Sequence, residues 1–394
     1  MIYDVKEFEQ IRPYNDNEVK QAVNELLNDR QFNRVLKNVF PWMPRIARNG
    51  MIRAAFIGVS STQKFQERLM YPLMKMLLRK CSTGHTFRHD TILPGRQRYT
   101  FVSNHRDIVL DSAILDVMLF DDKFPTTCEI AIGDNLLIYP WIRTLVRLNK
   151  AFTVRRGISA RELLRSSHLM SKYMHYAIEE KKENIWIAQR EGRAKDSSDH
   201  TQESVLKMLA LEGDGTPIDR LATLNIVPLT ISYEYDPCDY LKAKEFQQKR
   251  DNPDWKKSKQ DDLDNMKTGI KGQKGHIHYQ TAPCINQWLA DYAGLPAPEM
   301  YKAIAHRMDL EIHKGYRLFP GNFVALDMLS GQPENATHYT HQEKKNFLDY
   351  IQSRIDLIDL PDKDVPFLRK QLFTMYANPV LNQRAAQAEC DEKK

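Results

Sequence analysis

Two periods of apolar spacing alternate along the middle of the chain. Short apolar runs, typical of buried strands, are separated by longer segments in which apolar residues recur every three or four positions. The short runs predict strands at Tyr99 to Ser103, Cys128 to Ile132, Ala151 to Val154, Ile185 to Ala188, Ile226 to Tyr233 and His276 to Gln280. The longer segments predict helices at Ser112 to Phe120, Pro140 to Leu148, Ala160 to Lys181 and Gln202 to Ala210. This alternation favours an α/β fold with a mixed, mainly parallel sheet flanked by helices.

The residues before this region carry helical patterns only. Residues 1–48 hold two successive patterns, which Pro41 and Pro44 bring to an end. Between Ile52 and Lys80, one helical face is apolar and its flanks are basic: Phe65, Leu69, Leu73, Met76 and Leu77, with Lys64, Arg68, Lys75, Arg79 and Lys80. Such a helix is typical of a membrane surface, but the pattern fits a core helix with a solvated basic rim equally well.

The residues after Leu295 are again helical in pattern. Helices are predicted at Tyr301 to Gly315 and at Thr340 to Ile358, where Thr340 and Glu343 form a capping box. The tail after Asn378 is polar and is expected to fray. We therefore predict a helical N-terminal extension (1–85), an α/β domain (86–290) and a helical C-terminal extension (291–394).

Composition places the chain among ordinary globular proteins, with 42% hydrophobic and 27% charged residues. The net charge of +6 suits an acidic partner or an anionic membrane and requires neither. Basic residues are not interleaved with aromatic ones, so nucleic-acid binding is not expected. Charge is concentrated in Tyr240 to Lys274, which predicts an exposed excursion with solvated charges.

Cysteine usage and the apolar runs bear on the compartment. Five scattered cysteines without a C-x-x-C pair indicate neither a disulfide framework nor a zinc site, and favour a reducing compartment. The N-terminal segment lacks the apolar core of a signal peptide. No apolar stretch reaches the ~20 residues that a transmembrane helix needs. We therefore expect a cytoplasmic protein without a transmembrane helix.

The first candidate for chemistry lies where a predicted strand gives way to a predicted helix. Ser103, Asn104 and His105 follow the strand, and helical spacing begins at about Ile108. Such a turn leaves backbone N–H groups free and can present a histidine to a ligand. Asp111 could fix the imidazole tautomer while the other ring nitrogen removes a proton. Taken alone, a single histidine is more often structural.

Three more segments add to this candidate. Arg155 and Arg156 follow a strand, and guanidinium groups there suit a phosphate. The next strand is followed by a glycine-containing turn with cations, a pattern that favours an anion site: Arg190, Glu191, Gly192, Arg193 and Lys195. Pro228 lies inside an apolar run, which predicts a strand start or an edge strand lining an apolar wall.

In order, FVSNHRDIVLDSA, AFTVRRG, IAQREGRAKDS and IVPLTISYEY resemble the four sequence blocks of the glycerolipid acyltransferases. That family acylates glycerol 3-phosphate and 1-acylglycerol 3-phosphate, and the resemblance spans about residues 90 to 285. It implies that His105 is the general base and Asp111 its orienting partner. It also assigns the acceptor phosphate to Arg155, Arg156, Glu191, Gly192 and Arg193, and the acyl region to the block that holds Pro228.

Two departures from the family pattern leave roles open. The family has four residues between histidine and aspartate, whereas five separate His105 from Asp111, so Asp107 is an alternative partner. The third block has no residue between Gly192 and Arg193, where the family has one. Which of Arg190, Arg193 and Lys195 meets the phosphate therefore stays open.

The resemblance implies acyl transfer from a thioester, acyl-CoA or acyl carrier protein, to an alcohol in phospholipid biosynthesis. We expect no metal, no cofactor and no covalent enzyme intermediate. The expected partners are the thioester, a phosphate-bearing lipid acceptor and, peripherally, the inner face of the membrane. A lysophospholipid or a hydroxylated or amino-acid lipid is an alternative acceptor.

Other classes fit less well. His105 and Asp107 fall in a stretch like a protein-kinase catalytic loop, but Ser112 replaces the required asparagine and no D-F-G is present. There is no G-x-S-x-G for a serine hydrolase. A metal-dependent hydrolase could use His276 and His278, but no carboxylate or cysteine cluster completes that site. A non-enzymatic membrane-binding protein would explain only the basic charge.

Overall fold

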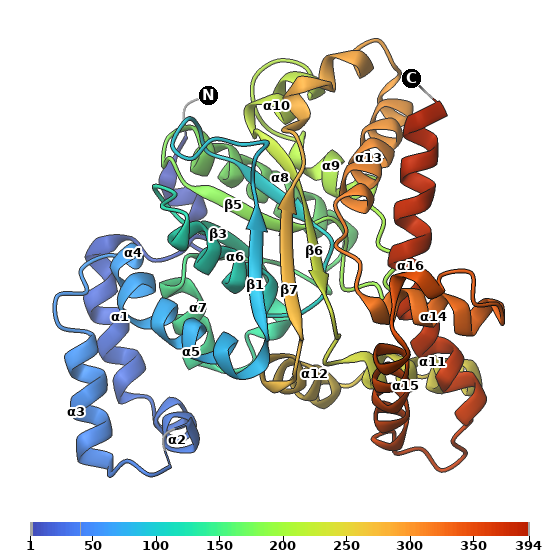
Figure 1. Ribbon diagram of the computed structural model, residues 1–394. Helices are drawn as coiled ribbons and strands as arrows, with labels where there is room; N and C mark the ends of the chain where they lie inside the picture. The colour runs from blue at the N-terminus through green and yellow to red at the C-terminus, as the bar shows by residue number, and fades with distance from the viewer. Residues whose placement is uncertain (1–2, 40, 393–394) are drawn as a thin grey trace.

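The structure is a computed structural model, and it describes residues 3–39 and 41–392. Within these residues seven strands form one sheet in the order β1-β7-β6-β2-β5-β3-β4 (Figure 1). They are β1 (Gly84–Arg88), β2 (Thr100–Ser103), β3 (Cys128–Gly133), β4 (Ala151–Val154), β5 (Asn184–Ala188), β6 (Ile226–Tyr233) and β7 (His276–Thr281). Strands β6, β2, β5, β3 and β4 are mutually parallel, whereas β7 is antiparallel to β6 and parallel to β1. The prediction of a mixed, mainly parallel sheet is confirmed.

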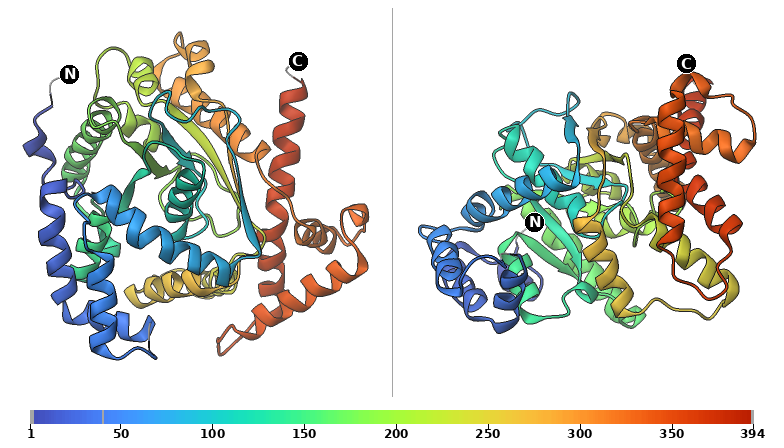
Figure 2. Two further views of the ribbon diagram at one scale, coloured as in Figure 1. Left: turned by 60° about the vertical axis from the view of Figure 1, so that its left-hand side comes forward. Right: turned by 60° about the horizontal axis from the view of Figure 1, so that its bottom comes forward.

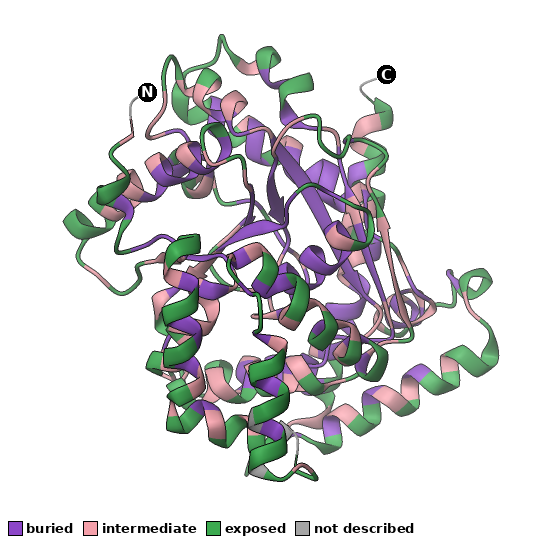
Figure 3. Cartoon of the chain, turned by 90° about the vertical axis from the view of Figure 1, so that its left-hand side faces the viewer, coloured by how far each residue is buried: buried purple, intermediate pink, exposed green. Residues whose placement is uncertain are grey.

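Helices cover both faces of this sheet. The face that includes Phe101 and Trp186 packs on α5 (Tyr71–Cys81) and α6 (Leu110–Asp121). The face that includes Val102 packs on α8 (Ala160–Glu179), α9 (Glu203–Leu209), α10 (Pro217–Thr223) and α13 (Ala297–Lys314). Phe101 and Val102 point to opposite faces because side chains alternate along a pleated strand. Figure 3 shows that the strands are largely buried, whereas the outer helices alternate between buried and exposed positions.

The N-terminal helices have an apolar core of their own. They are η1 (Val5–Phe8), α1 (Asp16–Asn28), α2 (Arg30–Val39), α3 (Arg45–Ala55), α4 (Thr62–Phe65) and the π-helical turn η2 (Gln66–Met70). Val19, Leu26 and Phe65 pack there with Leu148 of α7 (Pro140–Leu148). Figures 1 and 2 place these helices on the opposite side of the sheet from the C-terminal helices.

The apolar face predicted for the Ile52 to Lys80 segment is wrong in part. Phe65 is buried, but Leu73 and Met76 of α5 are exposed, and Met74 and Leu78 are buried instead. The reason is the π-helical turn between α4 and α5, because its wider turn changes the angular spacing of side chains that the α-helical period assumes. The buried face therefore shifts between the two helices.

The C-terminal helices pack around a further apolar cluster. They are α14 (Pro320–Ser330), α15 (His341–Asp356) and α16 (Val365–Glu392), with α11 (Asp239–Asp251) beside them. The capping box of Thr340 and Glu343 at the start of α15 is confirmed. The short elements η3 (Asp134–Leu136), η4 (Ile285–Gln287), η5 (Leu289–Tyr292) and η6 (Ala336–His338) complete the chain with α12 (Lys259–Lys271). The sequence patterns missed β1, α10 and α14, and the domain boundaries at residues 85 and 290 stay a prediction.

The predicted frayed tail after Asn378 is wrong. Helix α16 continues to Glu392, and Ala386 within it is buried. Asn378 donates to the carbonyl of Asp196 (2.7 Å), and Gln383 donates to the carbonyl of Tyr316 (2.6 Å). The tail is polar because its side chains hydrogen-bond to backbone groups of neighbouring segments.

The predicted exposed excursion at Tyr240 to Lys274 is wrong in part, since residues 249–254 are exposed but the helices on either side of them are partly buried. Its residues form α11 and α12, and Lys242, Asn265 and Lys274 are buried. Lys242 forms an ion pair with Asp236, and Lys274 donates to two backbone carbonyls. Charged side chains are buried here because each has a partner, which composition alone does not reveal.

Candidate active site

The candidate site lies at the carboxyl ends of the five parallel strands. Ligand sites of open α/β sheets occur at these strand ends. The chain leaves β2 after Ser103 and enters α6 at Leu110, so the His105 turn lies there. Asn104 fixes the turn to β6, because its side chain donates to the carbonyl of Ile231 (2.9 Å) and accepts from the Ile231 N–H (2.7 Å).

His105 and Asp111 form a hydrogen-bonded pair. Nδ1 of His105 lies 2.8 Å from Oδ2 of Asp111, which is fully buried, while the histidine side chain stays 13% exposed. The same Oδ2 accepts the backbone N–H groups of Arg106 (2.6 Å) and Asp107 (3.1 Å). Such a network suits an ionised carboxylate, which accepts the Nδ1 proton and leaves Nε2 as the basic nitrogen. No described residue hydrogen-bonds to Nε2, and the histidine side chain keeps a small exposed surface.

Asp107 faces away from His105. Its Oδ1 accepts the N–H groups of Val109 and Leu110 (both 2.9 Å), which caps the start of α6. Burial and the charge of Asp111 raise the pKa of Asp107. Of the two aspartates that the sequence left open, the geometry therefore pairs Asp111 with His105.

An aromatic side chain from the next strand orients the histidine ring. Trp186 of β5 meets His105 edge to face, with ring centroids 5.7 Å apart. The indole nitrogen of Trp186 in turn donates to Oγ of Ser103 (3.0 Å). The imidazole is therefore held by a polar contact at Nδ1 and an aromatic contact at its face.

The segments that follow β4 and β5 meet through an ion pair. Nη1 of Arg156 lies 3.2 Å from Oε1 of Glu191, and both side chains are exposed. Arg155 donates instead to the side chain of Gln10 (2.6 Å). Gly192 has a φ of +71°, a left-handed conformation that glycine adopts without strain. The structure thus brings Arg156 and the Glu191–Gly192 turn together beyond the carboxyl ends of β4 and β5.

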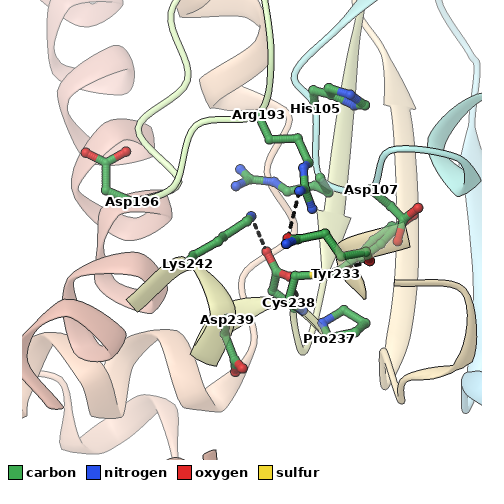
Figure 4. Close-up of polar contacts among 12 residues, drawn as sticks. His105, Asp107, Arg193, Asp196, Tyr233, Pro237, Cys238, Asp239 and Lys242 are labelled. Carbon is green, nitrogen blue, oxygen red and sulfur yellow. Dashed lines mark hydrogen bonds and ion pairs between the residues drawn. The ribbon is translucent and has the colours of Figure 1, made fainter. Parts of the chain in front are cut away.

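Arg193 and Lys195 turn the other way. Arg193 points into the protein toward Cys238 (Figure 4) and donates to Oδ1 of Asn265 in α12 (3.0 Å). Its Nη1 is buried and has no hydrogen-bond partner among the described residues. Lys195 forms an ion pair with Glu245 of α11. Arg190, between β5 and this turn, is partly buried.

Comparison with known proteins matches this part of the chain to a family. Residues 84–232 match the family model Acyltransferase. The match covers less than half of the chain. Among solved structures, the chain is similar to the 1-acyl-sn-glycerophosphate (LPA) acyltransferase PlsC from Thermotoga maritima, with 9% identity and a TM-score of 0.38 over 70% of this chain and 95% of that one. No curated protein matches it by sequence.

The loop after β5 is held by C-terminal residues that the sequence patterns did not single out. Arg106 and Asp199 form a buried ion pair (3.2 Å), and Arg106 also contacts the hydroxyl of Tyr316 (3.3 Å). Asp309 of α13 accepts the backbone N–H of Thr201 (2.7 Å). These contacts fix the loop that carries Arg193 to the turn that carries His105.

Pro228 lies in an interior strand, so the predicted strand start or edge strand is wrong. Strand β6 is flanked by β2 and β7, and Pro228 is its third residue. Its carbonyl accepts the N–H of Ala282 beyond β7 (2.8 Å), so its nitrogen faces the same side. The proline is tolerated because the β6–β7 ladder begins only at Leu229.

His276 and His278 lie on β7 opposite the last residues of β6, and both contact the neighbouring strand β1. Both contact Oγ1 of Thr86 in β1 (3.1 and 2.7 Å), and His276 also contacts Arg317 (3.2 Å). Burial lowers the pKa of both histidines, and the charge of Arg317 adds to the effect. In the described part of the chain, no group of three or more His, Cys, Asp or Glu side chains is placed to hold a metal ion.

Proposed function

We propose that this protein is an acyltransferase, which moves a fatty acyl group from an acyl thioester, acyl-CoA or acyl carrier protein, to the hydroxyl of glycerol 3-phosphate or 1-acylglycerol 3-phosphate in phospholipid biosynthesis. The observation that carries the proposal is the His105–Asp111 pair at the strand ends. A base with a free Nε2 suits an alcohol acceptor, and Arg156 lies exposed at the same strand ends for a phosphate.

The proposed mechanism needs the side chains of the pair only. Nε2 of His105 removes the hydroxyl proton as the oxygen attacks the thioester carbonyl, and Asp111 stabilises the imidazolium that forms. The imidazolium then returns the proton to the departing thiolate. General base catalysis typically contributes ~100- to 10,000-fold, and no metal, cofactor or acyl-enzyme is required.

We propose that the acceptor phosphate binds to arginine side chains, for which the structure offers candidates at the surface and one in the interior. Arg155, Arg156 and Arg190 lie near the surface, where an arriving phosphate could compete with Glu191 for Arg156. Arg193 is the buried candidate, since its Nη1 has no hydrogen-bond partner among the residues that the structure describes. Gly192 lets the backbone approach the ligand closely, and Pro228 lies in the strand proposed to border the acyl region.

The test is acyl transfer by His105→Ala. Wild type and variant are given one labelled acyl-CoA or acyl carrier protein thioester, with glycerol 3-phosphate and 1-acylglycerol 3-phosphate in parallel. We expect a loss of at least ~100-fold. His168→Ala is the matched control, because His168 also pairs with a carboxylate, Glu212 (2.7 Å), but outside the site. Turnover retained by His105→Ala, or lost equally in both variants, contradicts the proposal.

We further propose that the protein binds peripherally to an anionic membrane, on the cytoplasmic side. The N-terminal segment exposes large apolar side chains at and beside α3: Trp42, Ile46 and Ile57 are 71, 88 and 72% exposed. Exposed Arg34 and Lys37 lie in the preceding helix α2, and exposed Arg53 lies in α3. Apolar residues that enter the headgroup region and cations that meet anionic lipid are the signature of an interfacial unit. Among the described residues no helix is long and apolar enough to span a bilayer.

Vesicle sedimentation tests this surface. We expect binding to anionic liposomes at low salt, and its loss in the combined variant Trp42→Ser, Ile46→Ser, Ile57→Ser. The control changes Leu357 and Leu381 to Ser, since these leucines are about half exposed but belong to the C-terminal helices. Equal binding by both variants would assign the membrane contact elsewhere.

A further inference from the structure

Two buried tyrosines reach Asp111 from neighbouring strands. The hydroxyl of Tyr233, at the end of β6, donates to Oδ1 of Asp111 (2.9 Å). The hydroxyl of Tyr279, on β7, donates to the backbone carbonyl of Asp111 (2.9 Å). Both rings are buried, and the antiparallel register pairs Ile231 with Tyr279 and so places the two tyrosines two residues apart on one face. The residues therefore differ in which group of Asp111 they bind.

We propose that Tyr233 is a positioning residue for the His105–Asp111 pair, and that its hydroxyl sets how strongly Asp111 holds the histidine proton. The inference deepens the proposed function and rests on it for its catalytic meaning. Tyr279 donates to a backbone carbonyl instead, and it reaches the carboxylate only through its contact with Tyr233.

The division of donors on the carboxylate supports this role. Oδ2 of Asp111 receives three donors, of which His105 is one, whereas Tyr233 is the donor to Oδ1. In a fully buried carboxylate, an oxygen without a donor is costly. The Tyr233 hydroxyl therefore holds the carboxylate plane in place and draws negative charge toward Oδ1, away from His105.

Tyr233 can act as a donor at any physiological pH. Burial raises its pKa well above the usual value, so the hydroxyl stays protonated. The other charged or titratable groups around the pair are Asp107 and Arg106 from the turn, Tyr279 from β7 and Lys274 from the segment before β7. The ring that contacts His105 from β5 is the uncharged Trp186. A change at Tyr233 that leaves all of these in place therefore reports on the carboxylate.

The expected effect of Tyr233→Phe has one direction. Without the hydroxyl, charge concentrates on Oδ2 and stabilises the imidazolium, so His105 holds its proton to higher pH. We expect its titration midpoint to rise by about 0.5 to 1 unit. The same change makes Nε2 less able to act as a base at low pH and leaves the carboxylate less firmly oriented. We therefore expect kcat to fall only at pH values below the raised midpoint, with KM for the thioester within about twofold.

The experiment is an NMR titration of the intact protein with ¹³C-labelled histidine, in which the His105 signal is assigned by its loss in His105→Ala. Tyr233→Phe is compared with Tyr279→Phe, which removes a buried hydroxyl from the same cluster and keeps the same ring. A higher titration midpoint of His105 in Tyr233→Phe, but not in Tyr279→Phe, supports the proposal. A midpoint equal to wild type, or an equal rise in both variants, overturns it.

A second substitution keeps the test independent of folding defects. 3-Fluorotyrosine at position 233 is a stronger hydrogen-bond donor of nearly the same size, so the midpoint should move down instead of up. An unchanged or raised midpoint contradicts the proposal. The titration needs no substrate, so it still decides the role of Tyr233 if wild type transfers no acyl group, a result that would defeat the proposed function separately.

Discussion

Replacing Asp111 and Asp107 in turn by asparagine separates the two aspartates of the turn. In Asp111→Asn, three donors meet the Oδ2 position, so the amide must place its oxygen there and turn its NH₂ group toward the Tyr233 hydroxyl. The tautomer of His105 is then preserved. The substitution removes the negative charge of the side chain and changes the hydrogen-bond geometry little. In Asp107→Asn, the amide oxygen still accepts from Val109 and Leu110, since asparagine caps helices as well as aspartate.

The magnitude follows from the type of hydrogen bond that is lost. A bond to a charged group contributes about 1.5 to 3 kcal/mol, and a neutral one about 0.5 to 1.5 kcal/mol. The imidazolium that forms in the transition state keeps only the neutral bond in Asp111→Asn. The difference is about 1 to 1.5 kcal/mol, and since 1.36 kcal/mol corresponds to a factor of ten, we expect kcat to fall about 5- to 13-fold. Asp107→Asn should leave kcat within about twofold, because Asp107 does not contact His105.

Steady-state acyl transfer with one thioester and one acceptor measures both variants, with thermal unfolding to show that each is folded. The larger kcat loss is expected for Asp111→Asn, with KM little changed. If Asp107→Asn is the slower enzyme, or if both equal wild type, the assignment of the orienting carboxylate to Asp111 is refuted.

Two further predictions concern packing and pH. A methyl group at Gly269 of α12 would overlap the Asp107 carboxylate, so Gly269→Ala should cost about 1 to 3 kcal/mol of stability and lower kcat by displacing the His105 turn. Gly50→Ala is the control, because a methyl group there meets open space on α3 and should be neutral or slightly stabilising. Equal melting temperatures of the two variants would contradict this prediction. Burial raises the pKa of Asp116 to about 7, so the folded state binds this proton more tightly than the unfolded state and stability is lost as pH rises toward 7. In urea unfolding, wild type should therefore lose about 2 kcal/mol relative to Asp116→Asn between pH 5 and 8, and parallel pH curves would refute the assignment.

The sequence by itself determined the α/β layout and the end of the parallel strands at which the site lies. Hydrophobic period separates strands from helices, and six of the strands lie within about a residue of their predicted bounds, since buried apolar runs are local signals. Strand β1 was missed because its residues, Gly84–Arg88, are only partly buried and carry no apolar run. The order of motifs placed His105, Arg156 and Glu191 at the ends of parallel strands, where topology brings them together.

Only the tertiary structure decided which partners these residues have. The choice of Asp111 over Asp107 depends on how the turn folds over five intervening residues, which spacing does not specify. Arg193 turns inward to Asn265, and Tyr233 reaches Asp111 across 122 positions, because β6 lies beside β2 in the sheet. The charged segment 240–274 and the polar tail are ordered by ion pairs and hydrogen bonds to distant residues. Local pattern reports burial and period, whereas the pairing of polar groups is set by contacts between segments far apart in the chain.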